Sequence, residues 1–503
     1  MDAIPFGEYR PDVSDFNNGY TANISNVIPR GDGYGPFPSW QVLTQTLPGA
    51  CRGGFYGRKT DGTVAVFAAT STRLYLLNNT TLAWSDVSKG GSPYTIIPSS
   101  GLWQFAQFNN YIIAVQASCS PQYYDLTSSV AFADLPGSPP AASYVSVVSR
   151  FVLLSGLVSL PYRIQWSGLN DPTNWTAGVN SSDFQDFPDG GIVRGAVGGD
   201  FGYVFQDQAI RQMVFAPGSD IIFSITKAAQ DVGLGSPYAL VAAGEDIHFY
   251  STKGFMKLSG GALIPIGRER VDRTFSKSWD NSAPQLMMGA HAPESGRVFW
   301  VYRSSSSGAS GFDSGFTYDS VLDRWTPFST SGQYLLSMSQ PGMTLESLDT
   351  IQSNIDLFPF SLDSVPGASS PKISMFDGTG ALGFFNGPNL EAILETGEQS
   401  AVKKRMFCQG FYPLTDAGGI LSGAPLPGGG ISGTVPAVMG CMTKRENLNV
   451  TPSQTIEQPM NGRGFVPSRA DTRHGRFCVR VQAGTIWTYA MGVDPLVTPR
   501  GKR

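Results

Sequence analysis

Between Val64 and Val298 the chain repeats one pattern: a short apolar or alternating segment, a turn, and a second such segment. Six copies start at intervals of 47, 40, 51, 44 and 52 residues, at Val64, Tyr111, Phe151, Gly202, Asp246 and Val298. Apolar runs of roughly four to eight residues between turn residues are typical of strands, so each copy predicts a β-hairpin. Repeats of about 40–50 residues with several short strands are typical of a β-propeller. We therefore predict an all-β propeller of about seven blades, with six and eight as alternatives.

The composition changes twice along the chain and divides it into three regions. Residues 1–50 are rich in Pro, Gly and Asn and predict an extended N-terminal arm with only short strands. Such an arm can close a propeller by pairing with its last blade, or it can reach a neighbouring subunit. Residues 51–388 hold the repeats and form the expected propeller, with a clear last hairpin at 373–385. Residues 389–503 contain longer alternating segments, which predict a distal β-sandwich-like domain.

Several repeats also carry a pair of aromatic residues around a turn. The pairs are Tyr75/Trp84, Tyr123/Phe132, Trp166/Trp175 and the more closely spaced Tyr318/Trp325. The residues between them include Asn, Asp and Ser, which favour turns because their side chains bond their own backbone. We expect these aromatics to pack between blades. The alternative is a ligand-stacking role, which requires Trp84, Trp175 and Trp325 to be exposed.

Composition and charge narrow the classes of function. The 503 residues are 41% hydrophobic and only 15% charged, with 59 Gly and 35 Pro, which fits an all-β protein with many tight turns. The formal net charge of −4 argues against a nucleic-acid-binding surface, because such a surface needs a basic face to neutralise phosphates.

Cysteines and terminal sequence indicate where the protein is made. The five cysteines are scattered, odd in number and outside any CxxC motif: Cys51, Cys119, Cys408, Cys441 and Cys478. We expect small buried apolar residues in a reducing compartment rather than a disulfide framework. The opening MDAIPFGEYRPD lacks the basic and apolar regions of a secretion signal. No stretch approaches the roughly 18 apolar residues that span a bilayer, so we expect a soluble protein made in the cytoplasm.

A search for catalytic chemistry assigns no residues. The three histidines, His248, His291 and His474, are far apart and lack metal-ligand spacing, and His248 lies on an alternating strand where a core histidine is expected. Motifs of the GxSxG, HExxH or GxxxxGK[ST] type are absent. We therefore predict a protein that is not an enzyme, with no catalytic, cofactor-binding or metal-binding residues and no cofactor.

The best acidic cluster is Asp183, Asp186 and Asp189, in the segment SSDFQDFPDGG. Calcium takes about six to eight oxygen ligands from a tight loop, and three carboxylates at this spacing can supply some of them. The intervening Phe and Pro interrupt the usual loop, so we expect a solvated loop, with a metal site as the alternative.

Several segments together resemble the tail nozzle proteins of short-tailed bacteriophages, also called tail hub or packaged-DNA stabilisation proteins. RIQWSGLNDPTNWTAG (Arg163–Gly178) resembles a recurring segment of that family, and GYVFQDQAIRQMVF (Gly202–Phe215) resembles its following blade. The stretch Val232–Phe275 has the strongest similarity. LETGEQ (Leu394–Gln399) and the closing TIWTYAMGVDPLVTPRGKR are similar to its distal domain. The resemblance covers 163–277 well and 394–503 moderately, and the order of the segments carries it.

This resemblance implies a structural virion protein. Six copies are expected to form a ring below the portal and its adaptor, retain the packaged genome and enclose the channel through which it is ejected. The implied partners are further copies of the chain, the portal-adaptor protein, tail fibre, spike or needle proteins, and genomic DNA that passes without sequence recognition. The implied location is the virion tail, assembled in the host cytoplasm. Residues facing the lumen are expected to be acidic or neutral, because a basic wall would hold the duplex.

Two other functions stay open at this stage. The first is a lectin-like propeller that binds glycans or a receptor, on a virion or in a cell. The second is a propeller hydrolase or lyase, which requires carboxylates that converge on the central pore.

Overall fold

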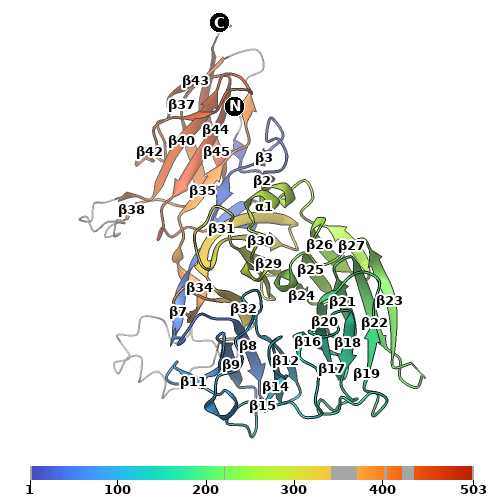
Figure 1. Cartoon of the computed structure of the whole chain (residues 1–503). Helices are drawn as coiled ribbons and strands as arrows, with labels where there is room; N and C mark the ends of the chain where they lie inside the picture. The colour runs from blue at the N-terminus through green and yellow to red at the C-terminus, as the bar shows by residue number, and fades with distance from the viewer. Residues whose placement is uncertain (1–2, 220, 341–370, 401–404, 422–434, 501–503) are drawn as a thin grey trace.

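The computed structural model describes residues 3–219, 221–340, 371–400, 405–421 and 435–500. Seven four-stranded antiparallel sheets are arranged around an axis, and two further sheets form a body beside them (Figure 1). The all-β propeller predicted from the repeats is confirmed, with seven blades. The helical elements of the described residues are short: η1 (Lys89–Gly91), η2 (Pro237–Ala239), α1 (Asp272–Ser278) and η3 (Pro284–Leu286). None of these helices has the length and apolar character needed to cross a membrane.

The first six blades each use four consecutive strands. Blade 1 consists of β8 (Gly53–Arg58), β9 (Val64–Ala69), β10 (Leu74–Leu77) and β11 (Trp84–Asp86). Blade 2 consists of β12 (Gln104–Phe108), β13 (Tyr111–Val115), β14 (Gln122–Asp125) and β15 (Ala133–Asp134). Blade 3 consists of β16 (Ala142–Val148), β17 (Phe151–Leu157), β18 (Arg163–Trp166) and β19 (Asp183–Asp186). Blade 4 consists of β20 (Val193–Val197), β21 (Phe201–Gln206), β22 (Ala209–Phe215) and β23 (Phe223–Gln230). Blade 5 consists of β24 (Val241–Ala243), β25 (Asp246–Ser251), β26 (Gly254–Ser259) and β27 (Ala262–Pro265). Blade 6 consists of β28 (Met287–Ala292), β29 (Arg297–Tyr302), β30 (Phe312–Asp319) and β31 (Arg324–Gly332).

The seventh blade is closed by the N-terminal region. It consists of β32 (Tyr334–Met338), β33 (Lys372–Phe376), β34 (Ala381–Asn389) and β7 (Pro38–Thr46). β7 runs antiparallel to β34, with Trp40 opposite Phe385. The Trp40 indole N–H also donates to the carbonyl of Met375 at 2.9 Å, which ties β7 to the next strand inward. Of the two roles open to the arm, the structure therefore shows closure of the last blade.

The two remaining sheets form the distal β-sandwich. One has the order β43 (Ala470–Thr472), β37 (Arg405–Thr415), β45 (Ala490–Arg500), β6 (Gly33–Pro36), β5 (Val27–Arg30), with β1 (Ile4–Pro5) on β45. The other has the order β4 (Ile24–Ser25), β35 (Ala392–Glu395), β44 (His474–Val481), β40 (Val438–Arg445), β41 (Ser453–Gln454), with β36 (Gln399–Ser400) on β44 and β42 (Gln458–Pro459) on β40. The small pairs are β2 (Glu8–Tyr9) with β3 (Tyr20–Thr21) and β38 (Ile420–Leu421) with β39 (Val435–Pro436). Residues before β7 therefore complete both sheets of the sandwich.

The sandwich and the propeller share one hydrophobic core. The buried cluster that contains Val27 and Phe411 of the sandwich also contains Phe255 of blade 5 and Trp300 and Trp325 of blade 6. Burial of large apolar side chains is the main favourable contribution to folding, so a shared cluster holds the two parts together.

Backbone hydrogen bonds reinforce this junction at Asn26, which has a left-handed φ of 58°. Its backbone N–H donates to the carbonyl of Pro327 in β31, and its side-chain oxygen accepts from the N–H of Ser329, at 3.0 and 2.8 Å. Its side-chain NH₂ donates to the carbonyl of Glu391 at 2.9 Å. One residue of the N-terminal region thus bonds both to blade 6 and to the segment that enters the sandwich.

Candidate functional site

The axis of the propeller contains a cavity of about 380 Å³. It is surrounded by the innermost strands of blades 2 to 7 and by the segment that contains η2. Its lining residues are Gln104, Phe105, Ala106, Tyr144, Val145, Ser146, Gly195, Ala196, Val197, Gly198, Pro237, Tyr238, Leu240, Ala242, Met288, Gly289, Tyr334 and Leu335. None of these is ionised at neutral pH. The convergent carboxylates that a pore-centred hydrolase or lyase requires are therefore not found among the residues that line this cavity.

The side chain of Tyr238 reaches across the axis of the propeller. The Tyr238 hydroxyl accepts a hydrogen bond from the backbone N–H of Leu102, just before blade 2, at 3.1 Å. Tyr238 itself lies in η2, just before blade 5, so its side chain bridges elements on opposite sides of the ring. The ring of Tyr144 lies 6.3 Å from that of Tyr238. Burial raises the pKa of Tyr238 to about 12, so the hydroxyl stays protonated at neutral pH.

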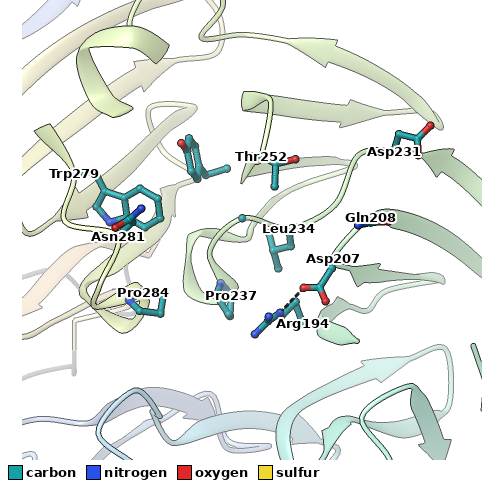
Figure 2. A pocket seen from close by; sticks show the side chains of 12 residues that line it. Arg194, Asp207, Gln208, Asp231, Leu234, Pro237, Thr252, Trp279, Asn281 and Pro284 are labelled. Carbon is teal, nitrogen blue, oxygen red and sulfur yellow. Dashed lines mark hydrogen bonds and ion pairs between the residues drawn. The ribbon is translucent and has the colours of Figure 1, made fainter. Parts of the chain in front are cut away.

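A larger pocket of about 890 Å³ lies where blades 4, 5 and 6 meet (Figure 2). We call it the inter-blade pocket. Its lining residues are Arg194, Asp207, Gln208, Asp231, Leu234, Gly235, Pro237, Tyr250, Thr252, Trp279, Asn281 and Pro284. They come mainly from the connections β21–β22, β23–β24, β25–β26 and β27–β28, which lie at one end of the blades. Loops on a fixed scaffold are the usual place for binding residues.

The charges of the inter-blade pocket are partly neutralised within it. Arg194 Nε lies 2.6 Å from Asp207 Oδ1, and Asp207 Oδ2 accepts from the backbone N–H of Ile192 at 3.1 Å. Asp231, on the other hand, is exposed and has no ion-pair partner among the residues that the structure describes. The lining therefore carries one positive and two negative side chains, with a net charge of −1.

One wall of the inter-blade pocket is aromatic. The Trp279 ring stacks on Phe275 with a centroid distance of 5.5 Å and an interplanar angle of 18°. Tyr250 packs edge-on against Trp279 at 5.3 Å. Phe275 is fully buried in the core shared with the sandwich, whereas Trp279 and Tyr250 are half-buried. The position of the indole is therefore set by the core behind it.

Two of the three aspartates of the acidic cluster found in the sequence, Asp186 and Asp189, form ion pairs. Asp183 and Asp186 lie on strand β19 and not in the solvated loop that was expected. Asp186 receives two hydrogen bonds from the Arg163 guanidinium, at 2.7 and 2.8 Å, and this contact lowers the pKa of its carboxyl. Asp189 lies 2.5 Å from Arg211 and 2.8 Å from Lys227, and hydrogen bonding to Lys227 lowers the pKa of its carboxyl. Within the described parts of the chain, no group of three or more Asp, Glu, His or Cys side chains is arranged to hold a metal ion.

The paired aromatics pack between blades, as the sequence predicted. Trp325 is fully buried, and its indole N–H donates to the carbonyl of Ile266 after blade 5, at 2.9 Å. Trp175 is 4% exposed and belongs to a cluster shared by blades 2 and 3. Trp84 is half-buried and donates to the carbonyl of Gln45 in β7, at 2.9 Å. These indoles are therefore used in packing rather than presented for ligand stacking.

The histidines and cysteines also have structural environments. His248 is 1% exposed, lies near the rings of Trp300 and Tyr318, and burial lowers its pKa to about 4. Four of the five free cysteines are buried and the other, Cys119, is partly buried. The prediction of buried cysteines is confirmed for these four. None of the three histidines belongs to a metal-holding group among the residues that the structure describes.

The inter-blade pocket was not predicted from the sequence. Its polar residues come from separate connections, and their side chains meet only when three blades are assembled. The only usable signal was the position of these residues in loops between predicted strands, which many other residues share.

No protein-family model matches the chain, and no curated protein matches it. Among solved structures, the WD40 domain of Pan2 from Neurospora crassa is 9% identical, with a TM-score of 0.37, over 60% of this chain and 90% of that chain. A quinoprotein alcohol dehydrogenase-like protein from Bacteroides thetaiotaomicron is 12% identical, with a TM-score of 0.33, over 55% of this chain and 66% of that chain. The extracellular domain of a hybrid two-component system from the same bacterium is 8% identical, with a TM-score of 0.38, over 75% of this chain and 43% of that chain. These likenesses concern the fold alone, which the sheet pairing establishes by itself.

Proposed function

We propose that the protein is a structural subunit of the tail nozzle of a short-tailed bacteriophage. In this role, six copies form a ring below the portal and its adaptor, retain the packaged genome and enclose its ejection channel. The proposal rests on the resemblance of residues 163–277 and 394–503 to such proteins. The structural observation that supports it best is the single core shared by the propeller and the sandwich, because it makes a stiff building block of two parts.

The route of DNA in this proposal lies between copies of the chain. The cavity on the propeller axis, about 380 Å³, equals a cube roughly 7 Å on a side, whereas the major groove of B-DNA alone is about 12 Å wide. Tyr238 also bridges this cavity. A duplex therefore does not pass along the axis of a single propeller, and a channel needs a ring of several chains.

A ring of six copies restricts the kind of contact that can join neighbouring copies. Cyclic symmetry of more than two copies requires a heterologous contact, in which one face of the chain meets a different face of the next copy. The net charge of −4 suits a wall along which a duplex slides, because phosphates are not retained by counterion release. Adaptor, fibre, spike or needle proteins would then bind the ends of the ring, in the virion tail.

The lectin-like alternative is not favoured at the positions that the sequence singled out, because Trp175 and Trp325 are buried and Trp84 is half-buried.

The oligomeric mass in solution tests the proposal. Light scattering coupled to size exclusion, run on the full chain alone and with a portal adaptor, should give a species of about 320 kDa, six times the 53.9 kDa chain. A monomer under both conditions would count against the ring.

A further inference from the structure

The inter-blade pocket has the size of a ligand site. Its volume of about 890 Å³ falls in the range of roughly 300–1,000 Å³ that is usual for small-molecule sites. It lies at a junction of three blades, and the proposed ring does not assign it any role.

The aromatic wall offers a flat, fixed apolar surface. Trp279 is held by the stacked ring of Phe275 and by the nearly perpendicular ring of Tyr250, so its orientation does not have to be set when a ligand arrives. Pre-ordered aromatic side chains supply contact area at a low entropic cost. Such a surface suits the C–H face of a sugar ring.

Polar side chains on the pocket lining can accept and donate hydrogen bonds. The Thr252 hydroxyl, the Asn281 and Gln208 amides and the Asp231 carboxylate have no side-chain hydrogen bonds to other described residues. Figure 2 shows Asn281 beside Trp279, and Thr252 between that wall and Asp231. Hydroxyls and amides both donate and accept, whereas a carboxylate only accepts. A ligand with many hydroxyl groups can use all of these side chains.

The charge of the lining excludes other ligand classes. A phosphate or sulfate would meet a net charge of −1, because Arg194 is already paired with Asp207. A wholly apolar ligand would cover the polar groups and leave them without hydrogen-bond partners, which opposes binding. We therefore propose that the inter-blade pocket binds a neutral oligosaccharide, with one sugar ring on Trp279 and its hydroxyls bonded to Asn281, Thr252 and Asp231.

Titration calorimetry on the full chain tests the proposal with a panel of neutral trisaccharides: maltotriose, cellotriose, mannotriose, galactotriose and N-acetylchitotriose. At least one should bind with one site per chain. Asn281→Ala and Asp231→Asn should each weaken that binding about tenfold, the loss expected for one hydrogen bond of about 1.4 kcal/mol. Both side chains are exposed, so neither change is expected to impair folding.

Asp200→Asn is the matched control, since Asp200 is exposed and outside the pocket, and it should bind like the unchanged chain. Trp279→Phe keeps an aromatic ring on Phe275 and should also weaken binding. The proposal is overturned if no trisaccharide of the panel binds, if only sulfated sugars bind, or if Asn281→Ala and Asp231→Asn bind as well as Asp200→Asn. These outcomes are independent of whether the chain forms a ring.

Discussion

The hydroxyl of Tyr238 accepts a hydrogen bond from the backbone N–H of Leu102, 3.1 Å away and on the other side of the propeller axis. Leu102 is 4% exposed, so its N–H has little access to water if this bond is lost. The contact joins the segment before blade 2 to the segment before blade 5, and it helps to close the axis of the propeller.

We predict that Tyr238→Phe lowers the free energy of unfolding by about 1–3 kcal/mol, because it leaves the Leu102 N–H unpaired. Urea unfolding measures the difference. Tyr162→Phe is the control. Tyr162 is 45% exposed, and loss of its hydroxyl should change the free energy of unfolding by less than about 0.5 kcal/mol. Equal effects of the two changes would contradict the role given to Tyr238.

A second prediction concerns the packing of β7 against β34, which closes the last blade. A side chain at Gly383 would meet the carbonyl of Gln41 at 2.1 Å and the Trp40 ring at 2.6 Å, so Gly383→Ala should push β7 away from β34. We expect a loss of about 2–4 kcal/mol in the free energy of unfolding, and faster proteolysis of the N-terminal region. Gly378→Ala has open space around it and should be nearly neutral. A neutral Gly383→Ala would mean that β7 is not packed in this blade.

The pH dependence of stability supplies a third prediction. Burial lowers the pKa of His248 from 6.5 to about 4 in the folded chain, so the unfolded state binds this proton first. The stability contributed by neutral His248 is full above pH 6.5 and is lost as pH falls toward 4, by on the order of 3 kcal/mol. Asp272 acts in the opposite sense, because burial raises the pKa of its carboxyl to about 6. Its protonation as the pH falls removes the free-energy cost of burying the charged carboxylate, and this stabilises the folded chain.

Comparison of the unchanged chain with His248→Phe isolates the histidine, since Asp272 contributes equally to both. The difference in unfolding free energy between them should shift in favour of the variant between pH 6.5 and 4. A constant difference over that range would show that His248 does not titrate with folding.

A fourth prediction concerns a buried ion pair within the sandwich. Glu398 is 2% exposed; its carboxylate pairs with Arg445, whose Nε donates to it at 2.6 Å, and Arg476 lies 3.7 Å away. Glu398→Gln should cost about 3–5 kcal/mol, because it leaves a partly buried guanidinium uncompensated. Glu446→Gln, in a pair at the surface with Arg405, should cost less than about 1 kcal/mol. Thermal unfolding of the two variants separates these cases.

The repeats predicted the blades because the alternation of apolar and polar residues that marks a strand can be read within a short segment of sequence. Each of the six hairpins identified from the sequence lies within one blade. Together with the hairpin at 373–385 they predicted about seven blades, with six and eight as alternatives, and the structure has seven. The pairing of β7 with β34 joins residues more than 300 positions apart, and the sequence offered it only as one of two options. The strands β1, β4, β5 and β6 were expected in an extended arm, and their places in the sandwich depend on distant partners that no local pattern specifies.

The candidate site was less predictable than the fold. Asp183, Asp186 and Asp189 stood out because they are close in sequence, yet the partners of Asp186 and Asp189 are Arg163, Arg211 and Lys227 on neighbouring strands. Trp279 and Asn281 were not singled out, because their neighbours in the pocket come from other blades. Proximity in sequence thus predicted strands well and side-chain clusters poorly.

In the proposed function, several copies of this chain enclose a channel that no single propeller provides. Electron microscopy of the assembled protein with bound duplex DNA tests it most directly. We predict a six-fold ring with an open axis, in which the duplex passes between copies and the axis of each propeller remains closed at Tyr238. Isolated single chains in every condition, or duplex density inside a propeller, would contradict the account.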